Sequence, residues 1–202
     1  MSRRPRLLLT RDRQGCARWA DRLSTLGAEA VALPCLDIVP SSDPRVADAL
    51  ITALADACWL ALTSRRGVDA VATILDRLGA PWPTARIAAV GPATAARARE
   101  IAGRVDLCPE RATAADLARA LWQAEGTDVG PVVLATADRG RRDLEAVLRP
   151  RGVEVRRIEV YSTRPAKAGR PSPDLDLRSL DGAFLASPSA VRGLLNQIDP
   201  PA

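Results

Sequence analysis

The chain has 202 residues, of which 47% are hydrophobic and 26% charged, and its net charge is +5. These proportions are typical of a globular protein with a substantial core. Because the sequence contains no histidine, it argues against histidine-based acid–base catalysis, Ser-His-Asp hydrolysis and most zinc sites.

No apolar run approaches the roughly 20 residues that span a bilayer. The amino-terminal MSRRPRLLLTRDR lacks the apolar length of a signal peptide. We therefore expect a cytoplasmic protein that does not contact membranes. The four cysteines show no C-x-x-C spacing and lie in apolar patterns, so we expect them to pack in the core rather than bind metal.

The basic charge favours an anionic partner. Arginine outnumbers lysine by 28 to one, and the six aromatic residues are scattered along the chain. Without a stacking platform or a basic helix, nucleic acid is not expected. No G-x-G-x-x-G or Walker pattern is present, so a nucleotide is not favoured either. A small molecule with several carboxylates fits this composition.

Strand and helix patterns alternate along the chain, which predicts parallel α/β sheets. Asp43-Pro44, Ser64 and Thr113 with Asp116 have the sequence of helix starts, and Gly27 and Gly79 that of helix ends. We expect extended segments at 6–10, 28–33, 36–40, 58–63, 86–90, 106–108, 132–136, 153–158 and 183–186, helices at 13–26, 45–55, 65–78, 95–102, 117–124 and 141–149 and from 188, and a linker at 166–174.

The sequence also contains an internal repeat. LLLTRDR from Leu7 matches VLATADR from Val133, and LPCLDIVP and LTSRRGV match IEVYSTRP and LASPSAV, all at offsets of 123 to 126 residues. Three matches in one order favour a duplicated unit over chance reuse of α/β patterns. The counterpart of VGPAT, from Val90, would fall near position 214, so we expect the second copy to be incomplete.

Small polar residues follow several predicted strands, where helices begin. Such positions gather at the carboxyl edge of a parallel sheet, and the free amides and dipoles of the helices can hold anions there. Each residue taken alone is also an ordinary helix cap. The residues concerned are Thr10, Ser64, Thr94, Thr136 and Ser187.

Motifs in one order along nearly the whole chain resemble those of the uroporphyrinogen-III synthase family. They are TR at 10–11, LP at 33–34, TSRRGVDAV at 63–71, VGPAT at 90–94, RGRRDL at 139–144, VYSTRP at 160–165 and SPSAV at 187–191. The resemblance implies two three-layer α/β domains with parallel sheets, joined by extended connectors at 36–40 and 161–165. The first domain would comprise 1–36 plus 165–202, and the second 37–164.

The resemblance also implies an activity: cyclisation of hydroxymethylbilane to uroporphyrinogen III, with inversion of the last pyrrole, loss of water, and neither cofactor nor metal. A tyrosine, protonated at neutral pH, can hydrogen-bond the departing hydroxyl. Tyr161 matches the family's tyrosine and is the expected catalytic residue. A transient contact with hydroxymethylbilane synthase is a further expectation. The expected substrate-binding residues are Thr10, Arg11, Ser64, Gly91, Thr94, Arg139, Ser187 and Ser189.

Two other hypotheses remain open at this point. The chain is either a non-catalytic module, regulatory or carboxylate-binding, that keeps the scaffold, or an unrelated α/β binding protein. Family members carry a second Gly-Pro-Thr-Thr-like turn after the SPSA helix, and this sequence lacks it. The resemblance therefore supports common ancestry more strongly than activity of the chain as given.

Overall fold

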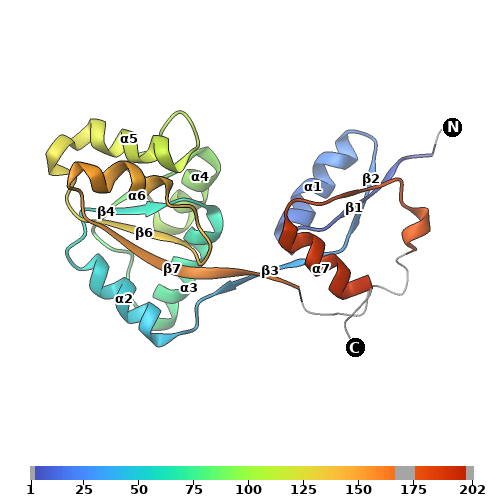
Figure 1. The fold of residues 1–202 in the computed structure, drawn as a ribbon, viewed down its shortest axis with the longest axis horizontal. Coiled ribbons are helices and arrows are strands. Elements are labelled where there is room, and N and C mark those ends of the chain that lie inside the picture. Colours follow the sequence, from blue (N-terminus) through green and yellow to red (C-terminus); the bar gives the residue numbers. More distant parts are fainter. Residues whose placement is uncertain (1–2, 167–175, 199–202) are drawn as a thin grey trace. The chain divides into compact units, whose positions relative to one another are not determined.

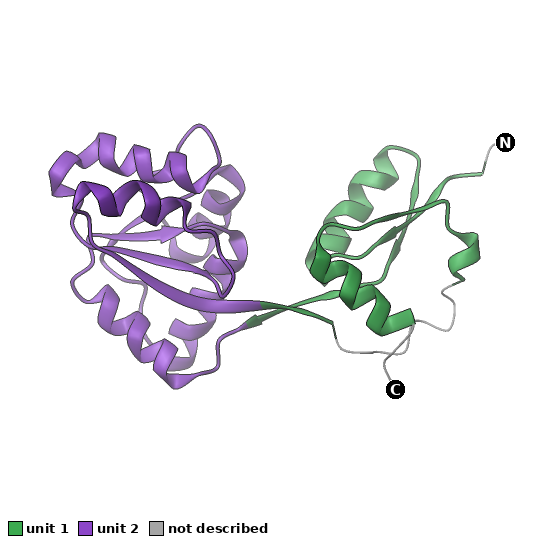
Figure 2. Ribbon diagram, viewed as in Figure 1, with its two compact units in different colours: residues 1–39, 163–202 green, residues 40–162 purple. Residues whose placement is uncertain are grey.

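The chain divides into two compact units in the computed structural model, which describes residues 3–166 and 176–198. The first unit comprises Met1–Val39 and Thr163–Ala202, and the second comprises Pro40–Ser162 (Figure 2). Two strands, β3 and β7, continue across the boundary between these units.

A five-stranded sheet in the order β3-β7-β6-β4-β5 organises the second unit. Neighbouring strands from β7 to β5 run parallel. The strands are β3 (Leu36–Pro40), β4 (Trp59–Leu62), β5 (Arg86–Ala89), β6 (Val132–Ala137) and β7 (Val155–Pro165). The helices are α2 (Pro44–Leu54), α3 (Arg65–Leu78), α4 (Pro92–Ala102), α5 (Ala114–Glu125) and α6 (Asp143–Leu148), with short 3-10 turns at Gly126–Val129 and Arg149–Arg151.

Helices cover both faces of this sheet, so the second unit has three layers (Figure 1). Every residue of β4 is buried, as expected for a parallel strand covered on both sides. Trp59 and Ala61 point to the face where α5 and α6 supply Leu121 and Leu144. The alternate residues of β4 therefore face the other layer, where α3 buries residues such as Val71, Ile74 and Leu75.

The expected helix starts in this unit are confirmed. Asp43, Ser64 and Thr113 each accept a hydrogen bond from a backbone N–H in the first turn of their helix. Gly79 ends α3 with φ of +61°, a conformation that suits glycine because it has no Cβ. Local sequence therefore defines both ends of α3, the helix that carries Ser64 at its start.

The first unit contains a three-stranded parallel sheet in the order β2-β1-β8. Leu8 packs with Leu33, Cys35 and Leu194, and Gly193 approaches the Cys35 carbonyl too closely to admit a Cβ. The elements are β1 (Arg6–Leu9), α1 (Arg13–Thr25), β2 (Glu29–Ala32), a 3-10 turn (Leu177–Ser179), β8 (Gly182–Phe184) and α7 (Pro188–Ile198).

Four expectations need correction. The helix predicted at 141–149 is only six residues long, because the charged DRGRR segment at 138–142 forms a loop before it. The strand predicted at 106–108 is a single bridge between Leu107 and Ala88. The segments 153–158 and 161–165 form one continuous strand, β7. Cys108 is exposed and Cys58 half-buried, whereas Cys16 and Cys35 are in the core as expected.

Most of the linker predicted at 166–174 lies outside the described residues. Within the described part of the chain, no helix combines the length and apolar character needed to cross a membrane. The same residues contain no cluster of cysteines and carboxylates suited to a metal ion.

Candidate functional site

The hydroxyl groups of Ser64 and Tyr161 lie 3.0 Å apart in the second unit. Ser64 follows β4 after one intervening residue and is the N-cap of α3, where its Oγ accepts the Gly67 N–H at 3.0 Å. Because this cap holds Ser64 in place, its hydroxyl offers Tyr161 a fixed partner. The Tyr161 side chain is largely buried, at 7% exposed.

A β-bulge sets the direction of Tyr161. Thr136 pairs with Glu159, but the next residue of β6, Ala137, pairs with Tyr161, so Val160 is an extra residue in β7. Side chains alternate between the faces of a strand, and an extra residue shifts that alternation by one. The bulge therefore turns Tyr161 away from the face of Arg157, toward α3.

The first turn of α3 approaches Tyr161 at Gly67. A Cβ at this position would lie 3.4 Å from the Ala135 carbonyl oxygen and 4.0 Å from Cε1 of Tyr161. The first turn of α3 therefore lies close to β6 and to the tyrosine ring. This close packing holds the phenol beside Ser64.

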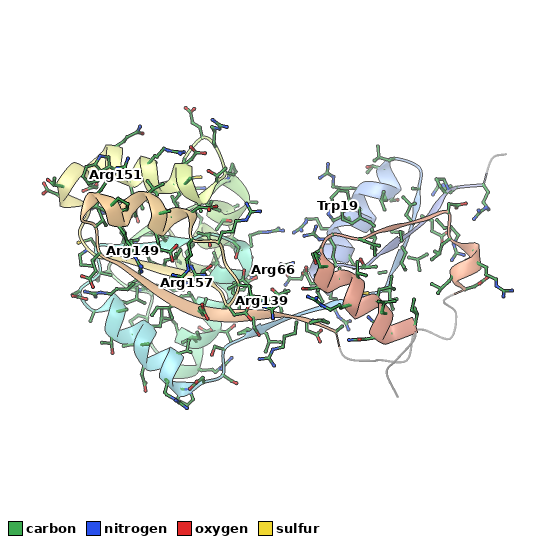
Figure 3. All side chains as sticks on the ribbon, viewed as in Figure 1. Trp19, Arg66, Arg139, Arg149, Arg151 and Arg157 are labelled. Atoms are coloured by element: carbon green, nitrogen blue, oxygen red, sulfur yellow. The ribbon has the colours of Figure 1, made fainter. Side chains whose placement is uncertain are left out.

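Other expected binding residues of the second unit share the carboxyl edge of its sheet, because β4, β5 and β6 are parallel. Gly91 follows β5 and starts α4 without a side-chain cap, while Thr94 in the first turn is buried. Arg139 lies in the β6–α6 loop and is exposed. Figure 3 shows Arg66, from the start of α3, and Arg139 at the same end of the unit. The sheet thus places a hydroxyl pair, helix starts and arginines at one edge.

Thr10 and Ser187, two expected binding residues of the first unit, already make internal contacts. The Thr10 hydroxyl is fully buried and donates to the Phe184 carbonyl at 2.7 Å. Ser187 caps α7 by accepting the Ala190 N–H at 3.2 Å. These contacts give both residues structural roles.

The side chains of the other two, Ser189 and Arg11, are both half-buried. Arg192 donates to the Ser189 hydroxyl at 3.4 Å. The Nε of Arg11 is buried without a hydrogen-bond partner among the described residues. Both residues belong to the first unit, as do Thr10 and Ser187, whereas Tyr161, Ser64, Gly91, Thr94 and Arg139 belong to the second.

A buried ion pair near the site was not expected from the sequence. Arg157 on β7 pairs with Glu145 on α6 at 2.9 Å, and their side chains are only 11% and 4% exposed. Charged residues in a strand, such as Arg156 and Arg157, usually face solvent. The only available signal was the Glu in the apolar face of DLEAVL, at 143–148.

A surface cavity of about 230 Å³ lies at the opposite end of the strands. It is lined by residues that precede β6 and β7, namely Thr127, Gly130, Pro131, Arg151, Gly152, Val153 and Glu154. It is therefore separate from the carboxyl edge where Ser64 and Tyr161 meet.

Comparison with known proteins identifies the family. The sequence profile described as "Uroporphyrinogen-III synthase HemD" matches residues 17–201. This chain belongs to the uroporphyrinogen-III synthase family. A uroporphyrinogen-III synthase of Synechococcus elongatus is 30% identical over 163 residues, which are 78% of this chain and 60% of that protein. A porphyrin biosynthesis protein HemD of Ruminiclostridium josui is 25% identical over 161 residues, or 78% of this chain and 32% of the relative.

Solved structures show the same fold. A mutant uroporphyrinogen III synthase from Thermus thermophilus matches with a TM-score of 0.62 and 18% identity, over 97% of this chain and 78% of that one. The uroporphyrinogen-III synthetase of Helicobacter pylori matches with a TM-score of 0.54 and 13% identity, over 98% and 79%. The two-domain α/β fold expected from the sequence is thereby confirmed. The chain spans less than two thirds of the length of either curated relative.

Proposed function

We propose that this protein is a uroporphyrinogen-III synthase, which cyclises hydroxymethylbilane with loss of water and inversion of the last pyrrole. The observation that carries the proposal is the Ser64–Tyr161 hydroxyl pair at the carboxyl edge of the second unit's sheet, in a chain of this family. The family membership supplies the reaction class, and the hydroxyl pair supplies a group suited to its first step.

The first step is loss of the substrate's hydroxyl. Tyr161 donates a hydrogen bond to this hydroxyl and assists its departure as water, which leaves an electrophilic azafulvene. The substituted α-carbon of the last pyrrole attacks this carbon and forms a spiro intermediate. Cleavage and reclosure of the neighbouring bond then invert the ring, and loss of one proton restores the pyrrole. The product therefore equals the substrate minus one water.

Ser64 orients the phenol for this step. Its Oγ is held by the Gly67 N–H, so the serine keeps its place when Tyr161 turns to the substrate. An oriented hydroxyl contributes because the reacting groups then need little further reorganisation. Neither residue requires a cofactor for this role.

The carboxylates of the substrate need positive groups. Arg139 is exposed, and no hydrogen bond or ion pair of its side chain occurs among the residues that the structure describes. Gly91 leaves the start of α4 without a competing side-chain cap. A guanidinium and a helix amino terminus are both suited to carboxylates. The first turn of α3 adds Arg65 and Arg66 and contains no acidic residue.

The proposal is tested by incubating the purified chain with hydroxymethylbilane, oxidising the products and separating the uroporphyrin isomers chromatographically. Formation of isomer III above the unassisted isomer I is the expected result. Tyr161→Phe and Ser64→Ala should lower the isomer III fraction. Isomer I alone, with tight binding of the substrate, would instead support the non-catalytic carboxylate-binding module.

A further inference from the structure

We propose that Arg157 and Glu145 act as positioning residues, forming a buried clamp that holds Arg139 in place to bind a carboxylate of the substrate. This inference rests on the proposed function, because it assigns a role within the same site. The clamp comprises Arg157 on β7, Glu145 on α6 and the β6–α6 loop at 138–142 between them. Figure 3 shows Arg139 and Arg157 on this part of the second unit.

The Arg157 guanidinium binds the loop as well as Glu145. It donates to the Glu145 carboxylate at 2.9 Å and to the Gly140 carbonyl at 2.7 Å. Two longer contacts, at 3.5 Å and 3.4 Å, reach the carbonyls of Ala137 and Arg141. One planar group therefore contacts α6, the end of β6 and two residues of the loop, which a single charge on a flexible lysine would do less well.

Gly140 shows how closely the loop fits the guanidinium. A Cβ at this position would overlap Oγ1 of Thr136 and lie 2.9 Å from an Arg157 nitrogen. The loop therefore passes between Thr136 and Arg157 with no room for a side chain. Displacing Arg157 removes one of the two groups that enclose Gly140.

Backbone hydrogen bonds hold the residues on both sides of Arg139, Asp138 and Gly140, in place. The Asp138 N–H donates to the Tyr161 carbonyl at 3.0 Å, and the Gly140 N–H donates to the Ala137 carbonyl at 3.0 Å. Arg139 itself points no polar atom to a partner within the described residues. The backbone of Arg139 is thus held next to β7, the strand that carries Tyr161, while its guanidinium remains accessible to a ligand.

A contribution to the stability of the fold does not by itself explain the buried Arg157–Glu145 pair. Burying an ion pair costs desolvation, and apolar residues of similar size often stabilise a fold as well or better. One carboxylate oxygen of Glu145 also lacks a hydrogen-bond partner in the described part of the chain. What the pair provides, and apolar residues would not, is a set of directed bonds to the loop carbonyls. A loop that is already ordered loses less conformational entropy when the ligand binds, so binding is stronger.

Hydrogen exchange of the loop in the full chain tests the clamp without requiring activity. Arg157→Met should accelerate exchange in 138–142 about tenfold or more, since charged hydrogen bonds are lost, while β4 and β6 remain protected. Arg157→Lys and Glu145→Gln should give smaller increases. Arg156→Met is the matched control on the same strand and should leave the loop unchanged. Unchanged loop exchange in all three clamp variants, or equal acceleration throughout the second unit, overturns the inference.

Binding of uroporphyrin, a fluorescent tetrapyrrole with the same kinds of carboxylate, tests the link to Arg139. Arg139→Gln and Arg157→Met should each weaken binding by about fivefold to tenfold, and the double variant should be no weaker, because both remove one contact. In an active enzyme, Arg157→Met should raise KM and leave kcat nearly unchanged, with partial rescue by lysine. Additive losses, or unchanged affinity in both single variants, contradict the clamp. If only isomer I forms, the proposed function fails, while exchange and uroporphyrin binding still decide the clamp.

Discussion

Ser64 and Tyr161, 97 positions apart in the sequence, place their hydroxyl oxygens 3.0 Å from each other. Each residue is held by a different structural feature: Ser64 by its role as the cap of α3, and Tyr161 by the bulge in β7. The pair is therefore a product of two independent constraints, and removing either hydroxyl should affect the site without unfolding the unit.

Tyr161→Phe is expected to lower turnover about tenfold or more while the chain stays folded. The change removes the group that hydrogen-bonds the departing hydroxyl, for which general acid catalysis typically contributes a factor of about 100 or more. Loss of the contact to Ser64 should cost about 1 kcal/mol of stability, because Ser64 keeps its bond to Gly67. Steady-state kinetics at saturating hydroxymethylbilane, together with thermal melting, check both effects. Unchanged turnover when chemistry limits the rate would assign Tyr161 to packing.

Gly91→Ala should destabilise the second unit and disturb the start of α4. The added Cβ would lie 2.5 Å from Cβ of Ala112 and 3.3 Å from its Cα, and such overpacking typically costs about 1–3 kcal/mol. The cause is steric, because Gly91 has an extended backbone. Combining Gly91→Ala with Ala112→Gly should restore most of the loss, with Ala112→Gly alone as the control. Equal melting of Gly91→Ala and the parent chain would show that the segment around Ala112 moves aside freely.

The first unit should exchange its amide hydrogens faster than the second. Its sheet ends at β8, a strand of three residues, where Phe184 and the adjoining Leu185 are 38% and 48% exposed. By contrast, β4 in the second unit is buried between two neighbours. Amides of core strands open only with large free-energy cost, whereas edges open locally.

Hydrogen exchange resolved by peptide would measure this difference. Gly193→Ala provides a directed perturbation, because its Cβ would overlap the Cys35 carbonyl within the first unit. This variant should accelerate exchange in β1 and β8 and leave β4 and β6 unchanged. Stronger protection in β1 and β8 than in β4 would reverse the expected order of stability.

Part of the stability of the second unit should be lost in acid. The Arg156 guanidinium hydrogen-bonds Asp56 and Glu154 and holds the pKa of each carboxyl below its usual value. A lowered pKa in the folded state means that the unfolded chain binds protons first, so this contribution is present above about pH 4.5 and fades as the pH falls through the folded pKa values. Both carboxylates are exposed, so the effect is modest and screened by salt.

Melting temperatures measured between pH 6 and pH 3 at low salt check this pH dependence. Arg156→Met should reduce the fall in melting temperature, and added salt should have the same effect in the parent chain. Arg45→Met is the control, since its contact with Asp43 is long, at 3.6 Å, and its side chain is 92% exposed. An equal fall in the parent chain and Arg156→Met would locate the acid sensitivity elsewhere.

Local sequence patterns were enough to predict the alternation of strands and helices, the helix caps and the glycine ends, because these depend on neighbouring residues. The side chains of Asp43, Ser64 and Thr113 each accept a hydrogen bond from a backbone N–H two or three positions away, so their capping roles could be predicted without knowledge of the fold. The motif order likewise identified the family and named Tyr161 and Ser64. In the charged segment before α6, the sequence pattern predicted a helix start at 141, two residues before the observed start at Asp143.

The way in which these residues come together depends on the tertiary fold. The bulge that turns Tyr161 toward α3 depends on the register between β6 and β7, which no local pattern specifies. The burial of Arg157 against Glu145 depends on where α6 packs on the sheet. In the first unit, the pairing of β8 with β1 gives the Thr10 hydroxyl an internal partner in the Phe184 carbonyl. Local chemistry selects which residues can act, whereas strand register and helix packing determine which of them share a site.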